Sequence, residues 1–276
     1  MTSKNTIAPV QPYLVLNAEN YRGIPAGRMG IANFYQFTVH RGAAGEFQAV
    51  PDGSTDLVFG IGEKDIKLYL GGTVLKAKQW EFEDGRTYFG VRFLPGKCVL
   101  PKSLKIQEVV NADLEIDVND YGKGLAEQIA QESCLEKRAE LFAEYLSQRQ
   151  ENAQERNTVT SIEKYVRRRI YESNGNVTIK ELAREAGYSE CYIRRSFELV
   201  HGISPKIFER FVRFQNMLGN IEKSPAESGI DCIAMECGYY DQSHMMKDFK
   251  SFTGTTPEHY RKMILEKRQK NSCTVL

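Results

Sequence analysis

The strongest constraint on the fold is an internal repeat in the last third of the 276-residue chain. The landmarks of the first copy recur in the second copy 51 or 52 residues later: Ala183 and Ala234, Gly187 and Gly238, Phe197 and Phe249, Gly202 and Gly254, and Pro205 and Pro257. The change of offset means that one residue has been added in the second copy, near Tyr240. Because the landmarks keep their order and spacing, we interpret them as two copies of one structural unit.

Each copy has the signals of two short helices joined by a tight turn. In the first copy, Ala183 is small enough to let a second helix cross closely, and Gly187 tolerates the positive φ of a turn. Ser189 can cap the next helix, on which Ile193 and Phe197 lie four residues apart and share one face. The matching residues of the second copy are Ala234, Gly238, Asp241, Met245 and Phe249. This pattern predicts two helix-turn-helix units, whose second helices each keep one face free for a partner such as the major groove of DNA.

A longer helix is expected between the two copies. Pro205 suits a first helical turn, apolar residues follow at helical spacing, and Pro225 marks the end. A helix over about 205–222 would be about 27 Å long at about 1.5 Å per residue. This length is near the roughly 34 Å between successive major-groove faces, so both units could reach one side of a duplex.

With Gly-Ile-Ser-Pro at 202–205, Gly-Thr-Thr-Pro at 254–257 and the ending Pro257-Glu258-His259-Tyr260-Arg261, the double motif resembles the DNA-binding domain of AraC/XylS-type transcription regulators. The resemblance covers roughly residues 160 to 263. It implies a sequence-specific regulator that binds double-stranded promoter DNA, contacts RNA polymerase if it is an activator, and is not an enzyme.

The resemblance also implies which side chains contact bases: Cys191, Arg194, Arg195, Gln242, Ser243, His244 and Lys247. The chemistry agrees, because arginine can bond bidentately to guanine and glutamine to adenine. The small thiol of Cys191 suits a thymine methyl better than a polar base edge. The alternative for Arg194 or Arg195 is a solvated charge, or an ion pair with Glu185 or Glu198.

Composition narrows the class of protein. The net charge is +1; residues 151–276 hold 20 basic and 17 acidic residues, and residues 1–150 hold 17 and 19. Phosphate attraction must therefore come from local placement of basic groups. The cysteines show no Cys-x-x-Cys spacing, so we expect reduced thiols and no metal or cofactor. We find no signal peptide or long apolar run, and therefore expect a cytoplasmic bacterial protein with no membrane partner.

Residues 29–118 contain short β-type segments about ten residues apart with Gly, Pro and Asp turns between them, which predicts a small barrel or sandwich. This fits the cupin-like sensor domain that many AraC-type regulators carry. His40 is the one histidine of the N-terminal half, which argues against a metal-dependent cupin enzyme. Alternation along the strands suggests an aromatic effector pocket, although the same residues could simply fill the core: Tyr35, Phe37, Phe59, Trp80, Phe89 and Phe93.

Residues 121–150 read as helical, with a break at 134–138, and in relatives helices here form a homodimer; the alternative is packing on their own barrel. We therefore expect an all-β cupin-like barrel with following helices over 9–146, a polar linker over 147–160, and an all-α double helix-turn-helix domain over 161–265.

The function predicted from these features is a transcription regulator controlled by a small-molecule effector in the β-domain. One alternative is an effector-free regulator controlled by a protein partner at that domain. The other is an enzyme with a DNA-binding tail, which would need a zinc cysteine cluster or a histidine triad that the sequence lacks.

Overall fold

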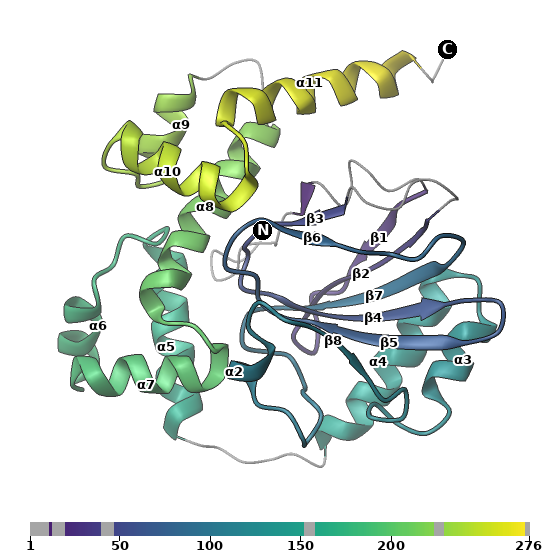
Figure 1. The fold of residues 1–276 in the computed structure, drawn as a ribbon. Coiled ribbons are helices and arrows are strands. Elements are labelled where there is room, and N and C mark those ends of the chain that lie inside the picture. Colours follow the sequence, from purple (N-terminus) through teal and green to yellow (C-terminus); the bar gives the residue numbers. More distant parts are fainter. Residues whose placement is uncertain (1–10, 13–19, 40–46, 152–157, 224–228, 274–276) are drawn as a thin grey trace.

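The computed structural model describes residues 11–12, 20–39, 47–151, 158–223 and 229–273. Within them the chain forms a β-rich N-terminal region and an all-helical C-terminal region (Figure 1). This arrangement confirms the fold class expected from the sequence. His40 and Pro225, on which sequence-based expectations rested, lie outside the described residues.

The β-rich region contains two antiparallel sheets. The larger has six strands, which follow one another across the sheet in this order: β1 (Arg22–Pro25), β2 (Ile31–Thr38), β7 (Thr87–Phe93), β4 (Thr55–Ile61), β5 (Ile66–Gly71) and β8 (Asp113–Ile116). The smaller sheet pairs β3 (Phe47–Ala49) with β6 (Lys78–Trp80). Short strands with turn residues between them produce this antiparallel arrangement.

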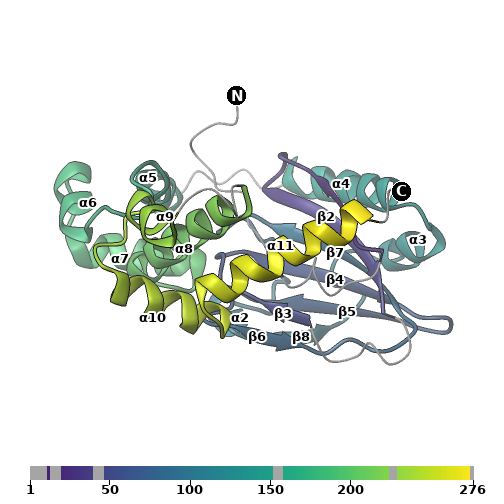
Figure 2. The ribbon, with the colours of Figure 1, turned by 90° about the horizontal axis from the view of Figure 1, so that it is seen from above.

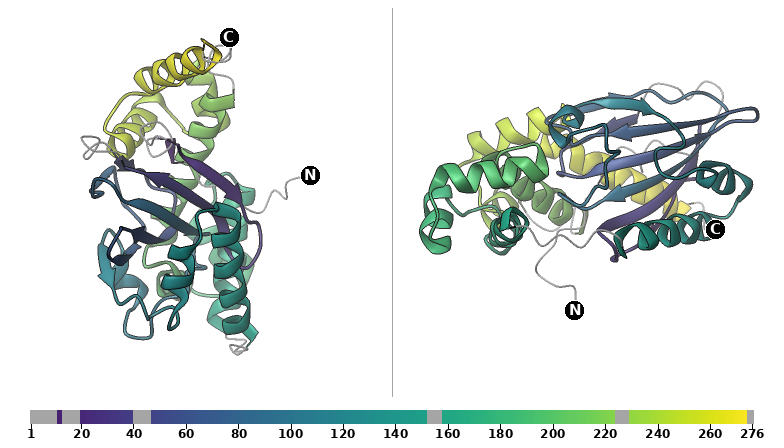
Figure 3. Two further views of the ribbon diagram at one scale, coloured as in Figure 1. Left: turned by 90° about the vertical axis from the view of Figure 1, so that its right-hand side faces the viewer. Right: turned by 90° about the horizontal axis from the view of Figure 1, so that it is seen from below.

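Both faces of the large sheet are covered. Helices α3 (Leu125–Gln131) and α4 (Leu135–Glu151) pack on one face (Figure 3). On this face the ring of Phe142 of α4 lies against the rings of Phe59 and Phe93. The small sheet contributes to a second apolar cluster on the other face. The apolar stripe of the helices therefore packs on the chain's own sheet, which was the alternative to a dimer interface.

The C-terminal region consists of helices alone. They are α5 (Thr158–Glu172), α6 (Ile179–Ala186), α7 (Glu190–His201), α8 (Pro205–Lys223), α9 (Ile230–Glu236), α10 (Gln242–Thr253) and α11 (Pro257–Cys273). The long helix α8 joins the two helical units, and its bounds confirm the predicted spacer helix (Figures 1 and 2). Its 19 residues span about 28 Å.

The expected linker over 147–160 is shorter in the structure. Helix α4 continues to Glu151 and α5 begins at Thr158, and the residues between them lie outside the described part of the chain. Gln148 is exposed and Ser147 and Arg149 are half-buried, so helix α4 extends through polar residues at the surface. The break between α3 and α4 falls at 132–134, slightly before the expected position.

A loop of the β-rich region packs into the helical region. Val50, which follows β3, is fully buried within the apolar core of the helices. The next carbonyl oxygen, that of Pro51, accepts a hydrogen bond from Gln215 Nε2 of α8 at 2.8 Å. Gly53 lies against the ring of Phe208, also on α8. We call this contact zone between the two regions, formed by residues 50–53 and helix α8, the seam.

Buried charges hold the seam loop in place. Arg92 of β7 donates to Asp56 of β4 at 2.8 and 2.9 Å, and to Asp52 of the loop at 3.3 Å. Asp52 also accepts from Gln11 Nε2 at 2.8 Å, and Gln11 exchanges two hydrogen bonds with the backbone of Val50. All three charged side chains are buried. Arg92 therefore has a structural role: it holds in place the loop that packs into the helical region.

Candidate nucleic-acid interface

The first helix-turn-helix unit is built by local capping. Thr178 Oγ1 accepts from the backbone N–H of Glu181, whose carboxylate accepts in return from the backbone N–H of Thr178, so α6 starts with a reciprocal cap. The helix ends at Gly187, which has a φ of 73°. Ser189 then caps α7 by accepting from the N–H of Tyr192 at 3.2 Å. The turn and the second helix begin where the sequence predicted.

The second unit repeats this construction. Helix α9 leads into Gly238, which has a φ of 85°. Asp241 caps α10 by accepting from the N–H of His244 at 2.7 Å. Helices α7 and α10 are thus the equivalent second helices of the two units, and we call them the recognition helices.

The recognition helices each bury one face and expose the other. Ile193 and Phe197 of α7 are fully buried, as are Met245 and Phe249 of α10. The predicted base-contacting residues are all exposed on the opposite faces: Cys191, Arg194 and Arg195 on α7, and Gln242, Ser243, His244 and Lys247 on α10. The structure therefore gathers these residues into two polar surfaces, one for each unit.

Only one of the three basic side chains Arg194, Arg195 and Lys247 forms an ion pair with a carboxylate among the described residues. Arg194 pairs with Glu190 one turn earlier at 3.1 Å, in a solvent-exposed contact of the kind that contributes little energy. Within the described residues, Arg195 and Lys247 form no ion pair. Glu185, a partner considered from the sequence, instead binds Arg169 at 2.9 Å. The hydrogen bond from Arg169 lowers the pKa of Glu185 to about 2.

Two tyrosines were missed in the sequence reading of this surface. Tyr188 is 41% exposed in the first turn and stacks on Tyr192 with ring centroids 4.9 Å apart. Tyr240, in the turn of the second unit, is 96% exposed. The residue added in the second turn was the available signal for Tyr240, whereas Tyr188 matches Tyr239, which is buried. Arg210 of α8 binds the buried carboxylate of Asp248 at 2.8 Å and so joins α8 to α10.

The six aromatic residues expected to line an effector pocket do not come together. Phe59, Phe89 and Phe93 pack on the helix-covered face of the large sheet. Tyr35, Phe37 and Trp80 belong to the cluster on the other face. The expectation of one shared pocket is therefore wrong, because the sheet separates the two groups.

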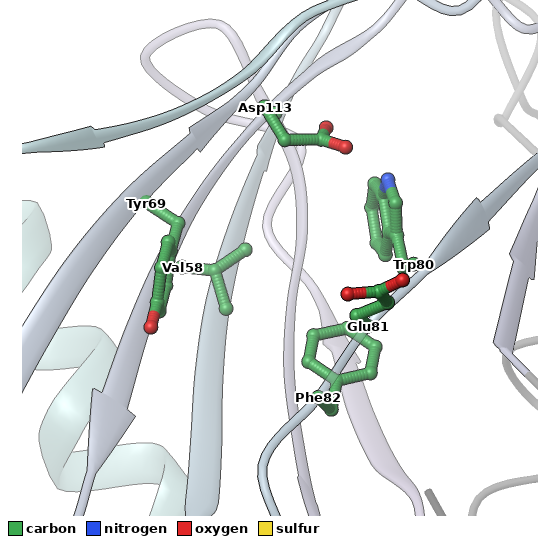
Figure 4. A pocket seen from close by; sticks show the side chains of 7 residues that line it. Val58, Tyr69, Trp80, Glu81, Phe82 and Asp113 are labelled. Atoms are coloured by element: carbon green, nitrogen blue, oxygen red, sulfur yellow. The ribbon is translucent and has the colours of Figure 1, made fainter. Parts of the chain in front are cut away.

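Of the six, Trp80 borders a pocket of about 70 Å³ between the two sheets (Figure 4). Its other lining residues include Val58, Tyr69, Phe82 and Asp113. This volume is far below the 300 Å³ or more that is typical of small-molecule sites, so the pocket is too small for a metabolite-sized effector.

A larger cavity of about 380 Å³ lies at the seam. Thr55, Thr73 and Lys105 line it from the β-rich region, and Leu199 and His201 line it from the last turn of α7. His201 is buried, which lowers its pKa, and its Nε2 lies 2.8 Å from Glu163 Oε1. Within the described residues, its Nδ1 has no hydrogen-bond partner. A molecule in this cavity would contact both regions at once.

No group of three or more His, Cys, Asp or Glu side chains within the described ranges could hold a metal ion. In the same part of the chain, we find no helix with the length and apolar character needed to cross a bilayer.

Comparison with known proteins identifies the class of the helical region. Residues 182–263 match the family model of a helix-turn-helix domain. A transcriptional regulator of this type from Haemophilus influenzae is 33% identical over 86 residues, which are 31% of this chain and 28% of that protein. The regulator YisR of Bacillus subtilis is 29% identical over 92 residues, 33% of this chain and 31% of YisR.

Residues 182–263 are therefore a helix-turn-helix domain similar to those of HTH-type transcriptional regulators. The chain spans less than a third of the length of each of these two regulators.

Two solved structures of ToxT from Vibrio cholerae are similar to the chain at low sequence identity. One is 12% identical with a TM-score of 0.40, covering 89% of this chain and 99% of ToxT. The other, of ToxT bound to an unsaturated fatty acid, is 13% identical with a TM-score of 0.39, covering 83% and 91%. A likeness at this level carries no argument about what this chain binds.

Proposed function

We propose that the chain is a transcription regulator that binds promoter DNA through both recognition helices. The observation that carries the proposal is the pair of equivalent helices, each buried on its apolar face and exposed on its polar face. A helix presented in this way fits the major groove with its early residues at the base edges. Helix α8 holds the two units at about the distance between successive groove faces.

The proposed contacts follow from the chemistry of the exposed side chains. Arg194 and Arg195 can each present a guanidinium fork to the guanine acceptors, and Gln242 can pair with adenine. Breaking the exposed contact between Arg194 and Glu190 costs little, so that pair does not oppose base contact. Lys247 is suited to a phosphate, which positions the protein without reading sequence.

The test is selection of bound duplexes from a random-sequence pool, followed by affinity measurements on the enriched sequence. Changing Arg194 and Arg195 together to Ala should abolish specific binding while leaving thermal unfolding unchanged. A control with Arg28 and Lys64 changed to Ala removes the same charge from exposed positions on the β-rich region. Failure of the wild type to enrich any sequence, or full affinity in the double-arginine variant, would contradict the proposal.

We further propose that a small-molecule effector binds in the seam cavity. Its volume of about 380 Å³ falls within the range typical of ligand sites. Lys105 and Thr73 offer polar contacts, and Leu199 and Ile106 offer apolar ones. Because the cavity borders α7, a ligand with different affinity for the docked and undocked states would shift the docking of the first unit.

A thermal-shift screen with metabolites tests the effector proposal. A binding metabolite should raise the unfolding temperature, and Lys105→Ala should reduce the shift, whereas Lys102→Ala, also exposed, should not. Binding that neither variant changes would place the effector elsewhere. If no metabolite binds and a protein partner captures the β-rich region, the regulator is effector-free.

A homodimer is also proposed, as is contact with RNA polymerase if the protein is an activator. The helices considered for dimerisation bury Leu135, Phe142 and Leu146 against their own sheet, so a dimer would use the polar outer face of α4 or another surface. Light scattering of the purified protein, free and bound to the selected duplex, measures the oligomeric state. Transcription from a promoter carrying the selected site separates activation from repression.

A further inference from the structure

The β-rich region contacts both recognition helices at the same place, their last turn. Gln107 of α2 (Ile106–Val109) donates from Nε2 to the carbonyl oxygen of Glu198 on α7 at 3.0 Å. Gln48 of β3 donates from Nε2 to the carbonyl oxygen of Thr253 on α10 at 3.1 Å. Two glutamines from different elements thus make the same kind of bond to equivalent ends of the repeated unit.

The contact continues onto the glycines that end the two helices. Gly202 follows α7 and packs so closely on α2 that a Cβ there would lie 2.5 Å from Val110 Cγ2. Gly254, its repeat equivalent after α10, lies beside Gln48 Nε2. The backbone N–H of Ala77 also donates to the carbonyl oxygen of Ser251 at 3.4 Å. Figures 1 and 2 both show the end of α10 beside β3 and β6, and Figure 1 shows the end of α7 beside α2.

These ends suit an amide donor. The last carbonyl groups of a helix lack partners within the helix, and they carry the negative end of its dipole. Gln48 donates to the carbonyl of Thr253, the last residue of α10. Gln107 adds a second donor to the carbonyl of Glu198, which also accepts from the backbone N–H of Gly202 at 2.9 Å. The early residues of both recognition helices, which carry the proposed base contacts, stay exposed. The contact thus fixes the helices without covering their polar surfaces.

The β-rich region also contacts the spacer helix, through the bond from Gln215 to the carbonyl oxygen of Pro51. It therefore touches the end of α7, the middle of α8 and the end of α10. Helix α8 alone would fix the length between the two units. Contacts at both ends also restrict how one unit can turn relative to the other.

We propose that Gln48 and Gln107 are positioning residues that set the spacing and relative orientation of the two recognition helices. The inference rests on the proposed function, because it concerns the DNA that both helices read. The DNA sequences contacted by α7 and by α10 are the two half-sites. On this proposal, contacts from the β-rich region determine which distance between the half-sites the protein binds best. One added base pair moves a half-site by about 3.4 Å along the duplex and by about a tenth of a turn around it.

The test uses the full-length protein and three duplexes built from the selected sequence, with the natural half-site spacing or one base pair more or less. The wild type should bind the natural spacing more tightly than the other two. Changing Gln48 and Gln107 together to Ala should reduce this preference by about threefold to tenfold, the effect expected for lost hydrogen bonds. Changing both to Glu, which keeps the shape and replaces the donor by an acceptor, should act in the same direction.

The matched control is Gln79→Ala. Gln79 is exposed on β6 directly opposite Gln48, and it should keep the wild-type preference. A purely stabilising role for the two glutamines would lower affinity for all three duplexes by one factor and leave the preference unchanged. That result would overturn the inference while the proposed function stands. A wild type that binds no selected duplex would overturn both.

Discussion

Glu209 gives the sharpest test of the energetics of the helical region. It lies on α8, is 5% exposed, and forms no ion pair or hydrogen bond with its side chain among the described residues. Burial raises its pKa from 4.5 to about 7, and the nearby charges of Arg213 and Lys206 offset only part of this rise. Between pH 5 and 6 the folded protein therefore holds a proton on Glu209 that an unfolded chain has largely lost.

The sign of the pH dependence follows from the raised pKa. Between pH 4.5 and 7 the folded state binds a proton that the unfolded state does not, so the free energy of unfolding falls as pH rises. A shift of this size corresponds to about 3 kcal/mol, lost once the pH exceeds the folded pKa. Glu209→Gln keeps the shape and removes the charge. It should stabilise the protein by about 1–3 kcal/mol at pH 8 and have little effect at pH 5.

The assay is urea unfolding of wild type and variant at several pH values between 5 and 8. The difference between the two proteins isolates Glu209 from other titrating groups. Glu258→Gln, an exposed change on α11, controls for the loss of one negative charge. A stability difference that stays constant across the pH range, or a variant less stable than wild type at pH 8, would refute the reasoning.

Three further changes have defined outcomes. Arg92→Ala should lower the free energy of unfolding by about 3–5 kcal/mol in urea titrations, because it leaves the buried carboxylate of Asp56 without its partner. Asp241→Ala removes the cap of α10 and should cost about 1 kcal/mol in the same assay, whereas unchanged stability would show that the cap is not used. Lys247→Ala should weaken binding to all duplexes alike and reduce the salt slope of log K by about one, as measured by salt titration; an effect confined to one sequence would point to base contact instead.

The helical region could be predicted well because its signals are local. Ser189 and Asp241 cap the recognition helices, and Gly187 and Gly238 occupy the turns. A cap or a turn depends on residues within one helical turn, so a single sequence contains what determines it. Repetition of these signals then gave the order of helices and the bounds of the spacer.

The β-rich region could be predicted only in outline, because strand register is not local. Alternation correctly placed Tyr35 and Phe37 on one face of β2. The structure pairs Tyr35 with Gly90 and Gln36 with Phe89, so Phe89 lies on the face opposite Tyr35. A shift of one residue moves every side chain to the other face, and nothing in one strand fixes this choice.

The ion pair of Arg92 likewise depends on a residue far away in the sequence. Its partner Asp56 lies directly across from it on the neighbouring strand, 36 residues earlier in the chain. A single sequence does not show which carboxylate Arg92 would meet across the sheet. The seam could not be predicted from the sequence either, since it joins residues that are more than 100 positions apart.

The burial of Val50 among the helices has a consequence for how the molecule comes apart. A side chain from one region completes the apolar interior of the other, so neither keeps an intact interior when they separate. We therefore expect melting as one cooperative event rather than two. A fragment containing only the helices would lack the Val50 side chain and would have a water-accessible cavity in its apolar core.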